Sequence, residues 1–367
     1  MKILLAPNAL KGSLSAADFA KAAEQVLKKK HHVRRICLSD GGDGFLDFFQ
    51  TLFPAAKRKY VPARNAFLKQ KRVPFLWLPD RKTAVLETAK ICGLGNLSQQ
   101  ELDIMHASSY GVGEVILKAV ATGAKTIYIG LGGVACSDGG AGMLQACGAA
   151  LFDKKENSLP QGAEPLLHLH RADFSALSKK LKGVKIFGVC DVTNPLLGPK
   201  SSAKVFGPQK GASPAQVKLL DKALTTWARA IQKETGRRIS DGKGTAAAGA
   251  IAAGLVGGFG AQLIGGAQFL TQKTQLEKWI CKADLVITSE GKLDRQTFYG
   301  KAPLTILELA KKHRKPVLFI CGQADEKALK NQPFAPQQLA VLTDFATNEQ
   351  DAKTHASKYL RRILKNI

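Results

Sequence analysis

One segment of the chain carries almost no large side chains: "GLGGVACSDGGAGM", residues 130–143, which follows the apolar run "AKTIYI". Glycines between a strand and a helix let backbone N–H groups approach a phosphate, and the helix dipole adds positive potential there. The segment matches neither the GxGxxG dinucleotide pattern nor the GxxxxGK[ST] P-loop. Its carboxylate, Asp138, could cap the next helix, hold Mg²⁺ through water or orient a substrate hydroxyl. A tight, closely packed turn is the alternative, but such a turn would not normally require "SDGGAG" as well.

Two loops near the N-terminus also carry chemistry-bearing residues. In "LAPNALKGSLS", residues 5–15, Lys11, Gly12 and Ser13 form a small anion cradle that leads into a helix. An ordinary capped helix start explains the same residues equally well. In "LSDGGDGFLDFF", residues 38–49, Asp40 and Asp43 flank paired glycines, which suits a metal ion or a polyol.

Two later loops combine acids with amides or lysines. Asp191 ends the apolar run "VKIFGVCD", where its carboxylate could accept a proton from an alcohol, and Asn194 then turns the chain. In "TSEGKLDRQTFYGKAP", residues 288–303, Glu290 and Asp294 stand among lysines. Carboxylates with lysines suit Mg²⁺ and polyphosphate, although a loop of ion pairs would use the same residues.

The elements that must position these loops are short apolar runs, which include residues 2–8, 34–40, 82–89, 184–191 and 283–291. Runs of this kind predict parallel strands buried on both faces, and helical patterns fall between several of them. Ser15 and the pair Ser213–Pro214 are plausible helix starts, while residues 54–82 favour a less regular crossing between domains. The alternation predicts an α/β fold, whose ligands gather beyond the carboxyl ends of the strands.

Length and composition restrict the class of protein. At 367 residues the chain is long enough for about two domains. The formal charge of +25 favours anionic partners, but the basic residues are scattered, so a generally basic proteome or an anionic small-molecule substrate is a better explanation than nucleic acid. Seven cysteines without a CxxC pair and the lack of a signal-like start predict a cytoplasmic protein. Residues 244–272 carry no charge, yet their Gly and Ala content predicts a buried, tightly packed helix pair rather than a membrane span.

At these loops the sequence resembles class I glycerate kinases, bacterial enzymes that phosphorylate D-glycerate from ATP. The resemblance spans nearly the whole chain. It rests on "LAPNALKGSLSA", "SDGGDG", "YGVGEVILKAVATGAKTIYIGLGGVACSDGGAGMLQACGA", "CDVTNPLLGPKSSAKVFGPQKGASP" and "ADLVITSEGKLDRQTFYGKAP", which occur in the family's order. Asn8 stands where the family usually has Asp, and Ser289 replaces a glycine. The family's "GPLG" turn has no clear counterpart in "VPARNAFLKQ", the region in which Arg64 lies.

The resemblance implies two α/β domains: a Rossmann-like one with a parallel sheet over residues 1–75 and 275–367, and an inserted one over 76–274, with the active site in the cleft. It implies ATP and Mg²⁺ as cofactors, with Asp191 as the base, Lys11 on a phosphate or carboxylate and Lys301 neutralising transition-state charge. The remaining candidates for substrate or phosphate contacts are Asn8, Gly12, Ser13, Arg64, Gly132, Gly133, Asp138, Gly139, Gly140, Asn194, Ser289 and Thr297. The candidates for Mg²⁺ are Glu290, Asp294, Asp40 and Asp43.

Two other classes of protein compete with this prediction. A nicotinamide-dependent dehydrogenase shares the α/β alternation but should carry GxGxxG after its first strand, where this chain has "APNALKGS". A nucleic-acid-binding protein would use the positive charge and show a steep salt dependence. We expect neither nucleic acid nor membrane as a partner; the oligomeric state stays open, with a homodimer as one option.

Overall fold

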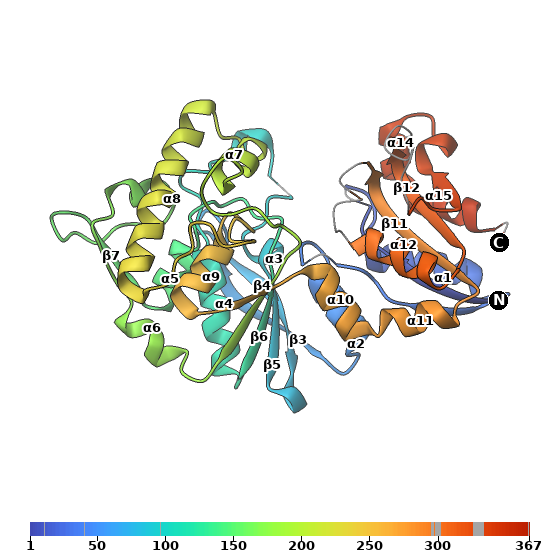
Figure 1. Ribbon diagram of the computed structural model, residues 1–367, viewed down its shortest axis with the longest axis horizontal. Coiled ribbons are helices and arrows are strands. Elements are labelled where there is room, and N and C mark those ends of the chain that lie inside the picture. Colours follow the sequence, from blue (N-terminus) through green and yellow to red (C-terminus); the bar gives the residue numbers. More distant parts are fainter. Residues whose placement is uncertain are drawn as a thin grey trace. The chain divides into compact units, whose positions relative to one another are not determined.

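The chain divides into two units in the computed structural model, which describes residues 1–10, 12–39, 41–95, 97–294, 297, 302–325, 334–365 and 367. The first unit comprises Met1–Asp40, Asp47–Pro54 and Gly266–Ile367. The second comprises Gly41–Leu46 and Ala55–Gly265. Each contains a sheet with helices around it (Figure 1), so the predicted α/β class is confirmed. The active-site cleft expected between the two domains stays a prediction.

The first unit is built on a five-stranded parallel sheet of order β13-β12-β11-β1-β2. Ile3 and Leu5 of β1 pack with Phe19 and Leu360 in the core on one face, which α1 and α15 cover, while α12 covers the other (Figure 1). The strands are β1 (Lys2–Pro7), β2 (His32–Arg35), β11 (Leu285–Leu293), β12 (Val317–Ala324) and β13 (Gln338–Val341). The helices are α1 (Ala16–Leu27), α2 (Phe45–Leu52), α10 (Gly266–Thr274), α11 (Leu276–Lys282), α12 (Ala302–Lys312), η6 (Leu342–Phe345), α14 (Glu349–Thr354) and α15 (Ala356–Leu364).

The second unit is built on a six-stranded sheet of order β10-β9-β6-β5-β4-β3, parallel from β10 to β5 and antiparallel at β4 and β3. Its strands are β3 (Lys57–Arg64), β4 (Gln70–Leu78), β5 (Thr83–Glu87), β6 (Thr126–Gly130), β9 (Lys185–Val189) and β10 (Gln262–Ile264); β7 (Ala150–Phe152) and β8 (Arg171–Asp173) pair separately. Its α-helices are α3 (Thr88–Cys92), α4 (Tyr110–Ala121), α5 (Ala141–Cys147), α6 (Ser175–Lys180), α7 (Ser202–Phe206), α8 (Pro214–Thr235) and α9 (Ile251–Phe259). Its short 3₁₀ turns are η1 (Pro79–Arg81), η2 (Gln99–Glu101), η3 (Glu164–His168) and η4 (Pro208–Lys210).

Local sequence chemistry explains where two of the helices begin. The Ser15 side chain accepts the backbone N–H of Asp18 at 3.0 Å and caps α1. Ser213 caps α8, with Pro214 at its first position and Gln216 completing a capping box. Both predicted helix starts are therefore confirmed.

The boundaries between the units differ from the predicted ones. Residues 55–75, which the sequence assigned to the first domain, belong to the second unit, because β3 pairs with β4 and β4 pairs with β5 along one edge of its sheet. The expected irregular crossing at residues 54–82 is wrong for the same reason. The other boundary lies at Gly265 rather than at 274, and Gly41–Leu46 form a separate short piece of the second unit.

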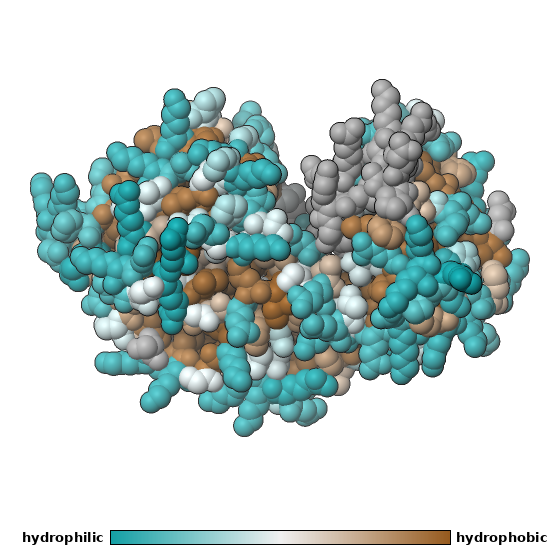
Figure 2. Space-filling view, viewed as in Figure 1, coloured by the Kyte–Doolittle hydropathy of each residue, from teal (hydrophilic) through white to brown (hydrophobic). Residues whose placement is uncertain are grey.

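The uncharged stretch at residues 244–272 contains α9 and the first seven residues of α10, so both expected helices are present. Helix α9 is tightly packed, because a Cβ on Gly254 would lie 2.8 Å from the Gly139 carbonyl oxygen. The two helices are not consecutive, since residues 262–264 form β10 between them, and α10 belongs to the first unit whereas α9 belongs to the second. Among the described residues no helix is long and apolar enough to cross a membrane. Figure 2 shows hydrophilic side chains scattered over the visible face, with apolar residues exposed in small areas between them.

Candidate active site

The carboxyl ends of β5, β6 and β9 meet the short Gly41–Leu46 piece in the second unit. Gly41 has a φ of +92°, and a Cβ there would lie 2.1 Å from the Val189 carbonyl oxygen at the end of β9. A Cβ on Gly132 would lie 2.8 Å from the Gly42 Cα. Backbone therefore packs directly on backbone here, and glycine is required at Gly41 both for its conformation and for its lack of a side chain.

A carboxylate that the sequence analysis missed anchors this piece of chain. Glu87, at the end of β5, is 1% exposed; its Oε1 accepts the N–H of Gly44 at 3.2 Å and its Oε2 accepts that of Leu46 at 2.9 Å. Burial raises the pKa of the Glu87 carboxyl, while these bonds and the Lys90 ammonium, 3.9 Å away, act in the opposite direction. The available signal was its position: Glu87 ends an apolar run, as Asp191 does.

Two backbone N–H groups of the glycine-rich segment already donate hydrogen bonds to other parts of the second unit. The Gly132 N–H donates to Thr88 Oγ1 at 3.2 Å, and the Gly139 N–H donates to the Gly249 carbonyl at 3.2 Å. Gly139 is buried, and a Cβ there would lie 2.5 Å from Trp227 Cδ1. Gly132 is half-buried and Gly133 is exposed. Of the predicted phosphate-binding glycines, therefore, only Gly132 and Gly133 lie at the surface of the second unit.

Asp138 is fully buried and its oxygens are already in use. Its Oδ2 accepts the Ser109 N–H at 2.8 Å, the Ser109 hydroxyl at 2.8 Å and the Gly142 N–H at 3.1 Å, while its Oδ1 accepts the Gly140 N–H at 3.1 Å. Burial raises the pKa of the Asp138 carboxyl against the lowering effect of these donors. Among its three predicted roles, the structure favours the cap: Asp138 and the buried Gly140 organise the start of α5 and present no open group to a ligand.

The buried Lys210 side chain holds the glycine-rich segment in place through two hydrogen bonds. It is 4% exposed, and its Nζ donates to the Cys136 carbonyl at 2.6 Å and to Ser137 Oγ at 3.1 Å. Burial lowers the pKa of the Lys210 ammonium, and the charge of Asp138 opposes that shift. A buried cation thus partly compensates the buried carboxylate.

Asp191 follows β9 at the same end of the sheet and is half-buried. Gly41 lies against the two residues before it, since a Cβ on Gly41 would also lie 3.1 Å from the Cys190 nitrogen. Asn194 serves the turn: its Nδ2 donates to the Lys200 carbonyl at 3.0 Å and its own carbonyl accepts the Ala246 N–H at 3.1 Å. Asp43 approaches the glycine-rich segment, because a Cβ on Gly133 would lie 3.3 Å from Asp43 Oδ1.

Arg64 is engaged at the end of β3. Its Nη1 lies 2.9 Å from Glu114 Oε1, its backbone N–H donates to Glu114 Oε2 at 2.7 Å, and its guanidinium stands 4.9 Å from the centre of the Tyr110 ring. Arg64 of β3 thus forms a surface ion pair with Glu114 of α4, and the substrate contact expected of Arg64 stays a prediction. The expected roles of Lys11, Asp40 and Lys301 lie outside the described residues.

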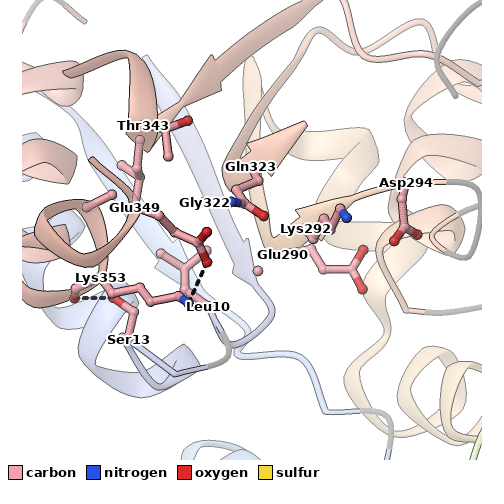
Figure 3. Close-up of a pocket in the computed structure, with 13 residues that line it drawn as sticks. Leu10, Ser13, Glu290, Lys292, Asp294, Gly322, Gln323, Thr343, Glu349 and Lys353 are labelled. Atoms are coloured by element: carbon pink, nitrogen blue, oxygen red, sulfur yellow. Dashed lines mark hydrogen bonds and ion pairs between the residues drawn. The ribbon is translucent and has the colours of Figure 1, made fainter. Parts of the chain in front are cut away.

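In the first unit a pocket of about 250 Å³ opens at the carboxyl ends of β11 and β12 (Figure 3). It brings together three predicted residues, Ser13, Glu290 and Asp294. The Ser13 hydroxyl donates to the Lys353 carbonyl at 2.7 Å. The other lining residues are Leu10, Gly291, Lys292, Gly322, Gln323, Leu342, Thr343, Glu349, Ala352 and Lys353.

Thr297 connects the two predicted metal ligands. Its hydroxyl donates to Glu290 Oε2 at 2.8 Å, while its Oγ1 accepts the Asp294 N–H at 3.2 Å. Across the described part of the chain, no three His, Cys, Asp or Glu side chains cluster closely enough to hold a metal ion. Among the described residues, Glu290 and Asp294 are thus two carboxylates without a third such side chain clustered with them.

The end of β1 is bonded to β11. The buried Ser289 hydroxyl donates to the Asn8 carbonyl at 2.8 Å, and Asn8 Oδ1 accepts the Ala9 N–H at 3.0 Å. Asn8 and Ser289 thus hold two strand ends together in this structure. Gly12 is exposed at φ +76° with open space beside it.

Comparison with known proteins decides the family. The glycerate kinase family matches residues 3–367. The chain belongs to this family. It is 36% identical over 355 residues to the glycerate 2-kinase of Escherichia coli K12, covering 95% of this chain and 93% of that protein. It is 34% identical to the glycerate kinase of Bacillus subtilis 168, and the match covers 100% of this chain and 97% of that protein. A crystal structure of a provisionally named glycerate kinase 2 from Salmonella typhimurium LT2 superposes with a TM-score of 0.81 at 35% identity, covering 100% of this chain and 96% of that one.

Membership of the glycerate kinase family confirms the resemblance found in the sequence loops. The chain is a phosphotransferase with an alcohol group as acceptor, and the family implies ATP as the phosphate donor. The roles of individual residues stay predictions.

Proposed function

We propose that this glycerate kinase transfers the γ-phosphoryl group of ATP to a hydroxyl of D-glycerate, giving 2- or 3-phosphoglycerate. The names of its relatives, matched over nearly their whole length, support this substrate. Phosphoryl transfer asks a protein mainly to position two reactants and to stabilise charge.

The position of Asp191 is the observation that carries the proposed mechanism. It is the first carboxylate after β9, and the backbone piece that contains Gly41 packs on the residues just before it. Gly132 and Gly133 follow β6 of the same sheet; Gly132 is half-buried and Gly133 is exposed, so their backbone lies at the surface of the second unit. We assign Asp191 to accept the hydroxyl proton as the oxygen attacks phosphorus.

Glu290 and Asp294 are the residues we propose for Mg²⁺. The ion prefers one or two carboxylates together with waters and phosphate oxygens, so a partial protein ligand set fits it. When bound, Mg²⁺ would neutralise charge on the transferred phosphoryl group. The Thr297 hydroxyl, which donates to Glu290, would hold that carboxylate in place. Lys11 and Lys301 are proposed to neutralise phosphate charge as well.

The experiment is a coupled ADP-release assay with D-glycerate, followed by NMR of the product to distinguish 2- from 3-phosphoglycerate. Asp191→Asn should lower kcat by about 100-fold or more, while ATP affinity changes little. Asp80→Asn is the matched control, since Asp80 is an exposed carboxylate of the same unit in η1. An Asp191→Asn enzyme as fast as the control would remove Asp191 from the role of base.

A further inference from the structure

The first-unit pocket, lined as given above, has an apolar wall. Leu10, Leu342 and Ala352 are all buried and all face it. At about 250 Å³ it is smaller than the roughly 300–1,000 Å³ of pockets that enclose whole drug-sized ligands. It therefore suits part of a nucleotide better than all of one.

Two neighbouring strands expose bare backbone to this pocket. Glu290 pairs with Cys321 and Lys292 pairs with Gln323, so Gly291 and Gly322 stand side by side between them. The two glycines are in close contact, because a Cβ on Gly322 would lie 2.7 Å from the Gly291 carbonyl oxygen. A side-chain-free strip of this kind lets a planar ring lie flat against the sheet edge.

The charge of the pocket is opposite to that of the chain. Three carboxylates and two ammonium groups leave a formal charge of −1, in a protein whose formal charge is +25. Glu349 Oε1 lies 2.6 Å from Lys353 Nζ, and the Glu349 carboxylate also accepts a hydrogen bond from the Gln323 side chain. These contacts lower the pKa of the Glu349 carboxyl, so this group is ionised at neutral pH. Such a pocket repels a bare triphosphate and favours an uncharged group that donates hydrogen bonds.

The residues proposed to contact the base and ribose lie toward one end of the pocket, and the carboxylates proposed for Mg²⁺ lie toward the other. In Figure 3, Glu349 and Thr343 stand on one side of Gln323, while Glu290 and Asp294 stand on the other. The first end combines the apolar wall with a carboxylate that can accept from ribose hydroxyls, and the second holds the carboxylates assigned to Mg²⁺.

We propose that the first-unit pocket binds the nucleoside part of ATP, with the base against Leu342 and Ala352, the ribose hydroxyls on Glu349, and the phosphates leaving past Glu290. This inference rests on the proposed function, because it assigns the phosphate donor of that reaction to one unit. The second-unit loops are then left for the hydroxy acid.

The test uses the full chain and two matched substitutions. Thr343→Phe places a ring in the pocket, whereas Thr354→Phe adds the same ring at the exposed end of α14, outside the lining. Adenosine binding is measured by calorimetry, and steady-state kinetics are measured with ATP and D-glycerate varied separately. We expect Thr343→Phe to weaken adenosine binding at least 10-fold. The same variant should raise the KM for ATP by a factor at least 10 times larger than the factor by which it raises the KM for D-glycerate. Thr354→Phe should show neither effect.

A second variant covers the case in which Thr343→Phe does not fold. Glu349→Gln keeps the size of the side chain and removes its charge, so adenosine should bind more weakly through its ribose. Equal adenosine affinity in wild type, Thr343→Phe and Glu349→Gln would overturn the proposal, as would adenosine that does not bind wild type. Failure of the proposed function looks different: adenosine binding would follow the expected pattern while D-glycerate is not phosphorylated.

Discussion

Replacing Gly41 by alanine tests whether the Gly41–Leu46 piece must lie directly on the end of β9. Gly44 provides the matched control within the same piece. Both glycines have positive φ, +92° and +86°, so alanine carries a similar backbone strain of about 1–2 kcal/mol at either position. They differ in space: a Cβ on Gly41 would lie 2.1 Å from the Val189 carbonyl oxygen, whereas a Cβ on Gly44 meets nothing within 4 Å.

The contact sets the size of the effect. Real Cβ atoms essentially never approach within 3.0 Å of another atom, so the loop or the strand end must move by about 1 Å. Overpacking of this kind costs roughly 1–3 kcal/mol beyond the backbone strain. Because Asp191 follows Val189 by two residues, we expect it to be displaced, and a displacement of about 1 Å in a catalytic group can cost about 100-fold in rate.

The assay combines urea unfolding with kcat and KM for D-glycerate. Gly44→Ala should lose about 1–2 kcal/mol of unfolding free energy and keep kcat within about threefold of wild type. Gly41→Ala should lose about 2–5 kcal/mol and lower kcat about 100-fold. If the two variants have the same activity, packing of this piece on β9 does not position Asp191, and the mechanism proposed here loses its structural support.

Two further predictions concern buried ionisable groups. Asp138→Asn should lower the unfolding free energy by about 2–3 kcal/mol in urea unfolding, because its amide cannot accept from Gly140 while its oxygen keeps the bonds from Ser109 and Gly142; wild-type stability combined with lost activity would instead point to a ligand role. For Cys37, burial raises the pKa of the thiol from 9 to about 11, so the unfolded chain releases this proton first and stability should fall between pH 9 and 11 by about 2–3 kcal/mol. Cys37→Ala should show a smaller fall over the same pH range, and an unchanged pH dependence would contradict this assignment.

The parallel core was predictable because its signals are local. The apolar runs at residues 2–8 and 283–291 become β1 and β11, since strands buried on both faces need continuous apolar residues. Edge strands gave no such signal. The edge strand β3 contains Pro62 and many exposed basic residues, a composition that locally resembles a loop and is tolerated at a sheet edge. Its neighbour β4 contains Pro74, which lies before the residues that pair with β5.

The candidate site was predictable in its residue types but not in its contacts. Asp138 had three roles open to it, and only the positions of Ser109 and Gly142 distinguish them. Glu87 was missed because its partners, Gly44 and Leu46, are about 40 residues away in the sequence. The glycines are a similar case. The sequence shows that they carry no side chains, whereas only the structure shows that the space beside Gly139 is occupied by the Trp227 ring and is not open to a ligand.

The central position of β1 has a consequence during synthesis on the ribosome. β1 lies between β2 and β11, and β11 is made roughly 280 residues later, which takes about 15–55 s at typical elongation rates. Through that interval one hydrogen-bonding edge of the nascent strand has no neighbour, while the sequence of the second unit, which ends at Gly265, is completed before β11. A chaperone that shields extended apolar segments would therefore have its binding site in the first ten residues, and its removal should reduce the yield of native enzyme more than its rate of catalysis.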